Sequence, residues 1–192
     1  MPISFDNTLF TGEKYVKPIL NIGCGGYSTH KQVWYGDVRI DIHKFPNVTI
    51  VMDAHKLGFR DRSFRKIVAY EVLEHLDSPI EALKEIRRVL SDDGIVEVTV
   101  PNIWYWRLLI SCWLGTRKPK ITSSDHKQVW DIYTFQMLAK QAGLYVTKID
   151  WLDWYGPPKN RKYAKLERLI RLFLPKHLKY THVSFLLEKS NI

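Results

Sequence analysis

Short, largely apolar runs recur along the chain and are separated by polar and glycine-rich segments. Several runs are continuous rather than alternating, a pattern typical of strands that are buried on both faces of a sheet. The pattern therefore predicts an α/β sheet. The runs that we expect to form strands are Pro18–Ile22, Asp37–Ile42, Val48–Asp53, Lys66–Glu71, Ile95–Val100, Leu144–Trp151 and His182–Glu188.

One amphipathic helix is expected between the fourth and fifth of these strands. Ser78 is a favourable N-cap, Pro79 suits the first helical position, and Glu81 lies where a capping box would place it. Apolar residues at helical spacing follow, and Asp92-Asp93-Gly94 would end the helix. The segment therefore predicts a helix that Ser78 and Glu81 cap.

Two further helices are expected in the second half of the chain. One runs from about Thr134 to Ala142 and stops at Gly143. The other lies within residues 157–176, before the last strand, and is amphipathic and basic. Its apolar positions are Leu166, Leu169, Ile170 and Phe173, and its basic positions are Arg161, Lys162, Lys165, Arg168 and Arg171. Before Ser78 the linkers are too short or irregular for full crossover helices, so we expect few helices there.

Composition indicates an ordinary globular protein. The chain has 192 residues, 45% of them hydrophobic and 26% charged, so we expect one domain over residues 1–192, with 1–17 as a lead-in. Cys24 and Cys112 have no zinc-site spacing and no secretion signal follows Met1, which favours the reducing cytoplasm. The most apolar run, Ile103–Leu114, has only twelve residues and is too short to cross a bilayer.

The net charge of +9 arises entirely in the second half of the chain. Residues 1–102 carry 13 Lys/Arg and 14 Asp/Glu, whereas residues 103–192 carry 16 Lys/Arg and 6 Asp/Glu. This excess would suit RNA, an anionic membrane surface or an acidic substrate, and a merely solvated basic surface is the other interpretation. A peripheral location at the membrane therefore stays open beside a cytoplasmic one.

A glycine-rich turn carries the candidate chemistry. The buried run that ends at Ile22 enters Gly23-Cys24-Gly25-Gly26, where glycines allow a ligand to approach the backbone closely. Asp41 ends the next strand about twenty positions later, where an acidic residue can bind a ribose diol. Tyr27 replaces the third glycine of a dinucleotide fingerprint, which disfavours a pyrophosphate-binding NAD site.

Six blocks of the chain, in order, resemble class I S-adenosylmethionine-dependent methyltransferases over roughly residues 18–150. They are residues 20–26 (LNIGCGG), 39–42 (RIDI), 52–59 (MDAHKLGF), 69–76 (AYEVLEHL), 85–94 (EIRRVLSDDG) and 98–102 (VTVPN). The resemblance implies a Rossmann-like, seven-stranded, mostly parallel α/β sheet with helices on both faces and an antiparallel last strand. Asn21 departs from the family's usual acidic residue, and Asp92-Asp93-Gly94 stands where Pro-Gly is usual.

The same resemblance implies roles for individual residues. Gly23 and Gly25 would line the methionine moiety, Asp41 would hold the ribose hydroxyls, and Glu71 would stand beside the sulfonium. Asp53 and the Ala54 backbone would meet the adenine. The full set expected to bind S-adenosyl-L-methionine is Asn21, Gly23, Cys24, Gly25, Asp41, Ile42, Asp53, Ala54, His55 and Glu71. We expect Cys24 to be a small packing residue and not a nucleophile, because no basic partner is near it in sequence.

The resemblance implies that the acceptor binds the segment that follows the fifth strand, here a substrate-side insertion at residues 103–131. No Asn/Asp-Pro-Pro-Tyr run indicates amino-group methylation, so oxygen is the favoured acceptor atom. The layout resembles O-methyltransferases that act on sugars or lipid-linked glycans. RNA ribose methylation and a non-catalytic partner subunit are the alternatives. Trp104, Trp106 and Trp113 are spaced as a buried helical stripe, which we favour over the lining of a substrate channel.

Glu71, Glu74 and His75 fall within one helical turn, and His126 follows the fifth strand at the same sheet edge. Two carboxylates and two imidazoles could hold Mg²⁺ or Mn²⁺ with positions open for a substrate diol. The pattern resembles metal-dependent O-methyltransferases that act on small-RNA ribose or on catechol-like quinone precursors. The other interpretation is that the motif orders the turn without a metal. In that case His126 is the expected general base, and His126 and Glu71 are the expected catalytic residues.

Overall fold

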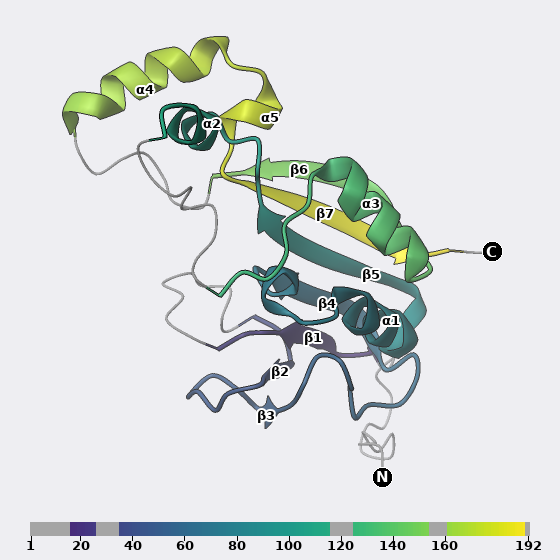
Figure 1. The fold of residues 1–192 in the computed structure, drawn as a ribbon. Helices are drawn as coiled ribbons and strands as arrows, with labels where there is room; N and C mark the ends of the chain where they lie inside the picture. The colour runs from purple at the N-terminus through teal and green to yellow at the C-terminus, as the bar shows by residue number, and fades with distance from the viewer. Residues whose placement is uncertain (1–15, 26–34, 116–124, 154–160, 191–192) are drawn as a thin grey trace.

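The computed structural model describes residues 16–25, 35–115, 125–153 and 161–190, and its sheet has seven strands (Figure 1). The strand order is β3-β2-β1-β4-β5-β7-β6. Strands β1 to β5 run parallel, and β7 is antiparallel to both of its neighbours, β5 and β6. The strands are β1 Ile19–Ile22, β2 Val38–Asp41, β3 Ile50–Val51, β4 Phe64–Tyr70, β5 Leu90–Pro101, β6 Leu144–Leu152 and β7 His182–Lys189. The predicted Rossmann-like sheet with an antiparallel last strand is therefore confirmed.

The described residues form one 3₁₀ turn and five α-helices. They are the 3₁₀ turn η3 Leu73–His75 and the α-helices α1 Pro79–Val89, α2 Trp106–Trp113, α3 Ile132–Gln141, α4 Arg161–Phe173 and α5 Lys176–Lys179. No α-helix precedes Pro79 within the described residues, which confirms the expected scarcity of helices in the N-terminal half. None of the described helices is long and apolar enough to cross a membrane.

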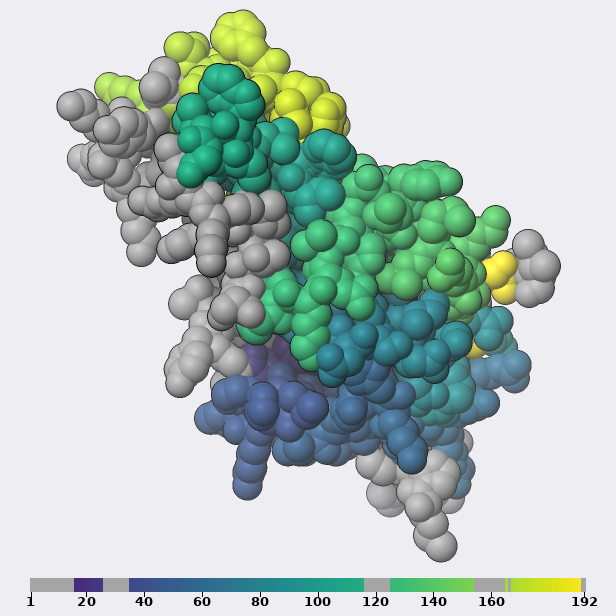
Figure 2. All heavy atoms as spheres, in the orientation of Figure 1, coloured from purple at the N-terminus to yellow at the C-terminus, as the bar shows by residue number. Residues whose placement is uncertain are grey.

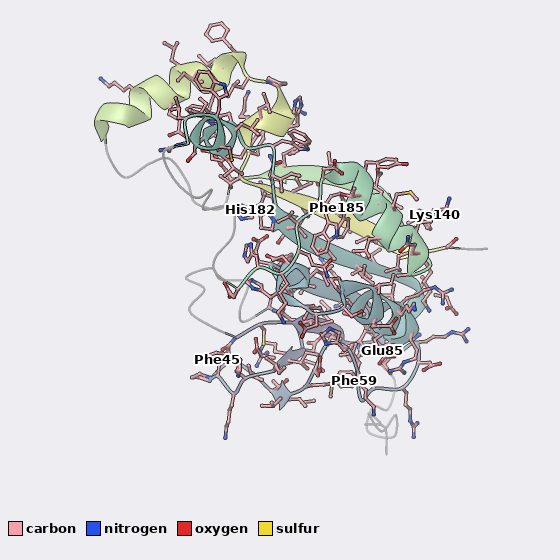
Figure 3. All side chains as sticks on the ribbon, in the orientation of Figure 1. Phe45, Phe59, Glu85, Lys140, His182 and Phe185 are labelled. Carbon is pink, nitrogen blue, oxygen red and sulfur yellow. The ribbon has the colours of Figure 1, made fainter. Side chains whose placement is uncertain are left out.

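Helices α1 and α3 lie together on one face of the sheet (Figure 1). Helix α1 buries Leu83 and Ile86, and α3 buries Phe135, whose ring stacks on Phe185 of β7 with centroids 4.2 Å apart. Figure 3 shows Phe185 on the sheet beneath α3. Burying these large side chains contributes about 1.5–3 kcal/mol each, so this layer is the main core.

The capping box predicted at Ser78 is wrong, because the Ser78 side chain makes no capping hydrogen bond. Its backbone N–H donates to the His55 Nε2 at 3.2 Å, and its φ of −133° and ψ of 81° are not the values typical of a capping residue. A capping box occurs at α3, where Asp131 and Thr134 bond each other's backbone N–H groups. The segment Asp92-Asp93-Gly94 also belongs to β5, because the chain passes from α1 into that strand at Leu90.

The buried stripe predicted for the tryptophans is wrong as well. Helix α2 buries none of its residues, and Trp113 and Trp104 are 84% and 45% exposed. The physical reason is that α2 is held from its first turn, where Tyr105 and Arg107 bond Glu167 of α4 at 3.2 Å. Periodicity indicated that the helix has an apolar face, but that face lies outside the core.

Candidate active site

A cavity of about 590 Å³ lies at the carboxyl ends of β1, β2 and β4. Strands β2 and β4 flank β1 on opposite sides, and such a switch point is where open parallel sheets bind ligands. The register pairs Ile22 with both Ile40 and Ala69, so the three strands end at one level. The lining includes eight of the residues predicted for the cofactor: Gly23, Gly25, Asp41, Ile42, Asp53, Ala54, His55 and Glu71.

The glycine turn leaves no room for side chains. Gly23 has a φ of +67°, and a Cβ there would lie 2.4 Å from the Val72 Cγ2. A Cβ on Gly25 would lie 2.1 Å from the Phe45 Cδ2. The Gly23 N–H donates to the Ile40 carbonyl at 2.8 Å, which closes the turn against β2. A ligand in the cavity can therefore contact the backbone directly, as the sequence predicted for this turn.

Asp41 is oriented by backbone donors. Its Oδ2 accepts from the Gly25 N–H and its Oδ1 from the His43 N–H, each at 2.9 Å. A carboxylate offers about four acceptor positions, so both oxygens keep capacity for a ligand. The side chain is thus fixed at the cavity wall with acceptors suited to a pair of hydroxyls.

Asn21 and Cys24 lie behind the cavity wall rather than in its lining. Asn21 is 3% exposed and its amide donates to the Tyr35 carbonyl at 3.0 Å. The Cys24 carbonyl accepts a hydrogen bond from the Asn47 amide. Burial, helped by the negative charge of Asp41, raises the pKa of the Cys24 thiol to about 11. A thiol with so high a pKa is a poor nucleophile, in keeping with the packing role expected for Cys24.

Asp53 and His55 form a second oriented pair. Asp53 Oδ1 lies 2.9 Å from the His55 backbone N–H, which donates to it, and 2.7 Å from the His55 Nδ1. The His55 Nε2 accepts from the Ser78 N–H, so Nδ1 is the protonated ring nitrogen. The hydrogen bond from the His55 backbone holds the pKa of Asp53 below its usual value. An ionised acceptor is therefore fixed in the cavity wall, on the segment that follows β3.

Glu71 directly follows β4 and has an unusual conformation, with a φ of +55° that is rare for residues other than glycine. Its N–H donates to the Thr99 carbonyl of β5 at 3.1 Å, and its Oε2 lies 3.1 Å from the His182 Nε2. His182 is buried and is the first residue of β7. Figure 3 shows it at that end of the sheet. Sequence reasoning missed His182, although an antiparallel last strand must begin at the edge where the parallel strands end.

Glu74 is the most buried acid at the site. It is fully buried, and neither carboxyl oxygen has a hydrogen-bond partner among the described residues. Burial, together with the negative charge of Glu71, raises the pKa of Glu74 to about 9, so this carboxyl is protonated at neutral pH. The Glu74 carbonyl accepts from the backbone N–H groups of Lys127 at 2.7 Å and Gln128 at 3.2 Å. These two hydrogen bonds anchor Lys127 and Gln128, and with them the segment around His126, to η3.

Two histidines meet beside Glu74. The rings of His75 and His126 pack edge to face with centroids 4.6 Å apart, and the His75 Nδ1 lies 3.2 Å from the Asp125 Oδ2. Burial and the neighbouring His75 hold the pKa of His126 below its usual value. One possible ligand atom from each of Glu74, His75 and His126 lies within 4.8 Å of the others. The structure thus groups three of the four predicted metal ligands and pairs Glu71 with His182 instead.

Comparison with known proteins places this geometry in a family. Residues 5–149 match the family model described as a methyltransferase domain. An uncharacterized protein of Methanocaldococcus jannaschii is 31% identical over 120 residues, which are 57% of this chain and 47% of that protein. The chain thus spans about half the length of the curated relative that it matches.

Solved structures share the fold at low identity. A SAM-dependent methyltransferase from Thermotoga maritima superposes with a TM-score of 0.66 at 14% identity, covering 92% of this chain and 84% of that one. A chain from the complex that contains the Trm112 methyltransferase activator of Haloferax volcanii has a TM-score of 0.58 at 14% identity, covering 91% and 82%. Together with the family match over residues 5–149, the fold shows that the chain belongs to the methyltransferase-domain family, as a class I S-adenosylmethionine-dependent methyltransferase domain.

Proposed function

We propose that this domain transfers the methyl group of S-adenosylmethionine to a hydroxyl oxygen of a sugar, either free or in a lipid-linked glycan. The observation that carries the proposal is the composition of the cavity at the switch point. It joins the glycine turn, Asp41 and Asp53 to Glu71 and to Asp125 and Lys127, the two neighbours of His126, which is not itself in the lining. Groups suited to binding the cofactor and groups suited to proton transfer therefore lie at the same cavity, as transfer between two bound molecules requires.

The cofactor is expected to lie along the first three strands. The free acceptor positions of Asp41 suit the two ribose hydroxyls, and the ionised Asp53, beside the buried Ala54, suits the adenine edge. The close approach allowed at Gly23 and Gly25 suits the methionine moiety. Glu71 then stands at the end of β4, nearest the sulfonium, where a carboxylate would favour the positive charge.

His126 is the proposed general base. As the acceptor oxygen attacks the methyl carbon and the carbon–sulfur bond breaks, the hydroxyl proton must leave. The lowered pKa of His126 keeps its imidazole neutral and able to accept that proton. Its Nδ1 is buried without a partner among the described residues, and its neighbours Asp125 and Lys127 line the cavity. The second product is S-adenosylhomocysteine, a neutral thioether at sulfur.

A divalent cation, Mg²⁺ or Mn²⁺, is a second proposal for the same place, favoured by the grouping of Glu74, His75 and His126. The buried, unpartnered oxygens of Glu74 support it, because a cation would satisfy them. Mixed nitrogen and oxygen donors suit Mn²⁺ better than Mg²⁺. When bound, such a metal acidifies a coordinated hydroxyl, and His126 would then be a ligand instead of the base.

Methyl transfer can be followed with S-adenosylmethionine that carries a deuterated methyl group. The acceptors offered are free monosaccharides, a polyprenyl-linked sugar and an oligoribonucleotide, and mass spectrometry locates the label. We expect label on sugar oxygen, with a loss of about 10²-fold or more in kcat for His126→Asn. The matched control is His177→Asn, an exposed histidine of α5. Label on the oligoribonucleotide alone, or on nitrogen, would overturn the acceptor assignment. Absence of S-adenosylhomocysteine binding would overturn the reaction.

A further inference from the structure

Helices α2, α4 and α5 form a helical lobe, defined as residues 104–115 and 161–180, at one end of the molecule (Figure 1). The lobe is attached to the sheet through Asn102, whose amide donates to the carbonyls of His177 and Tyr180, each at 2.7 Å. Within it, Glu167 accepts from Tyr105 and Arg107. The lobe is therefore an ordered extension of the carboxyl end of β5, and Figure 2 shows it protruding from the main body.

The exposed surface of this lobe is strongly apolar. Trp113, Phe173 and Leu172 are 84%, 82% and 70% exposed, more than any other large apolar side chain described. Five further apolar side chains of the same lobe are also exposed: Trp104, Leu109, Ile110, Leu114 and Leu169. Apolar residues exposed singly are common, but a group of this kind on one lobe indicates a binding surface.

The charge of the lobe has one sign. Its residues include eight Lys/Arg and one acid, Glu167, and that acid is buried against Arg107. Lys165, Arg168 and Lys176 are exposed, with no acidic side chain of the lobe exposed beside them. Two of the described cations are paired, since Arg107 bonds Glu167 and Arg171 bonds Asp153, which follows β6. The partner of this surface must therefore be both apolar and anionic.

We propose that the helical lobe docks on the surface of an anionic lipid bilayer. Tryptophan, phenylalanine and leucine beside lysine and arginine are the composition of helices that lie in the membrane interface. The aromatic rings would sit at the depth of the headgroups, and the cations would contact lipid phosphates. Nucleic acid would match the charge but would leave Leu172 and Leu169 without apolar contacts. The surface is distinct from the cavity, so the inference goes beyond the proposed methyl transfer.

Docking would also set the position of the cavity. The lobe ends where β7 begins, and the first residue of β7, His182, contacts the cavity residue Glu71. A lobe bound at the bilayer thus holds the acceptor side of the cavity close to the lipid surface. An acceptor that carries a lipid anchor would then reach the site without leaving the membrane.

Vesicle flotation of the full chain, with no cofactor present, tests the proposal independently of methyl transfer. We expect binding to vesicles of phosphatidylcholine with phosphatidylglycerol, weaker binding to phosphatidylcholine alone, and loss of binding at high salt. Lys165→Glu with Arg168→Glu should weaken binding about tenfold or more. Trp113→Ser with Phe173→Ser should do the same, because it removes apolar contacts. These side chains are exposed, so the variants should fold normally.

The matched control carries the same kinds of change on α3, Met137→Ser with Lys140→Glu, at exposed positions away from the lobe (Figure 3). It should bind vesicles as the wild type does. The proposal is overturned if no vesicle binds, or if the control loses as much binding as the lobe variants. It is also overturned if Trp113→Ser with Phe173→Ser binds vesicles as the wild type does but loses a self-association that the wild type shows in size-exclusion chromatography. The apolar surface would then be an interface between copies of the chain. Salt-sensitive binding of an oligoribonucleotide that only the charge variant loses, without vesicle binding, would identify a nucleic-acid surface instead.

Discussion

Replacing Asp41 with alanine separates two effects of one carboxylate. The folded protein loses the acceptor for the N–H groups of Gly25 and His43, each at 2.9 Å. Because water can reach both donors, the free energy of unfolding should fall by only about 1 kcal/mol for each bond. A bound cofactor loses in addition an ionised acceptor for its ribose hydroxyls. That loss should weaken binding by roughly 1–3 kcal/mol, which is roughly a 5- to 150-fold rise in Kd.

Calorimetric titration with S-adenosylhomocysteine measures the second effect, and thermal unfolding of the same samples without ligand measures the first. The matched control is Asp37→Ala, because the Asp37 carboxylate also accepts a backbone N–H, from Ile19 at 2.8 Å, but does not line the cavity. Both variants should lose a little stability, and only Asp41→Ala should lose affinity. The reasoning is refuted if Asp41→Ala binds the ligand as the wild type does, or if Asp37→Ala loses affinity equally.

Three further predictions test neighbouring features. Gly25→Ala should weaken S-adenosylhomocysteine binding about tenfold or more, ~1.4 kcal/mol, because the added Cβ would lie 2.1 Å from the Phe45 ring. The control Gly58→Ala, whose Cβ would lie 3.4 Å from its nearest atom, should bind as the wild type does in calorimetry. Between pH 4.5 and about 9 the unfolded chain ionises Glu74 while the folded one does not, so wild-type Tm in chelator should fall with rising pH. Glu74→Gln should flatten that decline and abolish any rise in Tm that Mn²⁺ gives the wild type. Asp131→Ala should lower the free energy of urea unfolding by about 1 kcal/mol, since α3 loses its cap.

The sheet could be predicted from the sequence because its signal is local. Each strand is a short apolar run, and the run at residues 182–188 is recognisable although it lies far from its partner in β5. The junction of α1 and β5 could not be predicted, because Asp92 and Asp93 look like a turn. Leu90 and Ser91 are nevertheless buried and begin the strand, with the Ser91 hydroxyl bonded to the Phe64 carbonyl at 2.9 Å. That contact is made only after β4 is in place.

The candidate site was predictable as far as motifs mark it. The glycine turn, Asp41 and Asp53 follow strands directly, so their meeting at one edge follows from parallel topology. The partners of these groups were not predictable, because a local pattern does not say which distant side chain fills the space. The contact of His182 with Glu71 and that of Asp125 with His75 both join side chains that are far apart in the sequence. The exposure of Trp113 was missed for a related reason, since periodicity reveals an apolar face without saying what covers it.

The antiparallel direction of β7 brings a late segment of the chain to a cavity that early segments form. Because β7 runs against β5, the connection from β6 to β7 returns to the edge where the first strands end, and His182 arrives there last. Apart from Asp125 and Lys127, the described residues that line the cavity come no later than Asp77, whereas α4 and α5 lie between β6 and β7, outside the parallel strands. The two functions that we propose, methyl transfer and membrane docking, are thus carried by separate segments of the chain. Changes in α4 and α5 can therefore alter the proposed docking surface while leaving the lining of the cavity as it is.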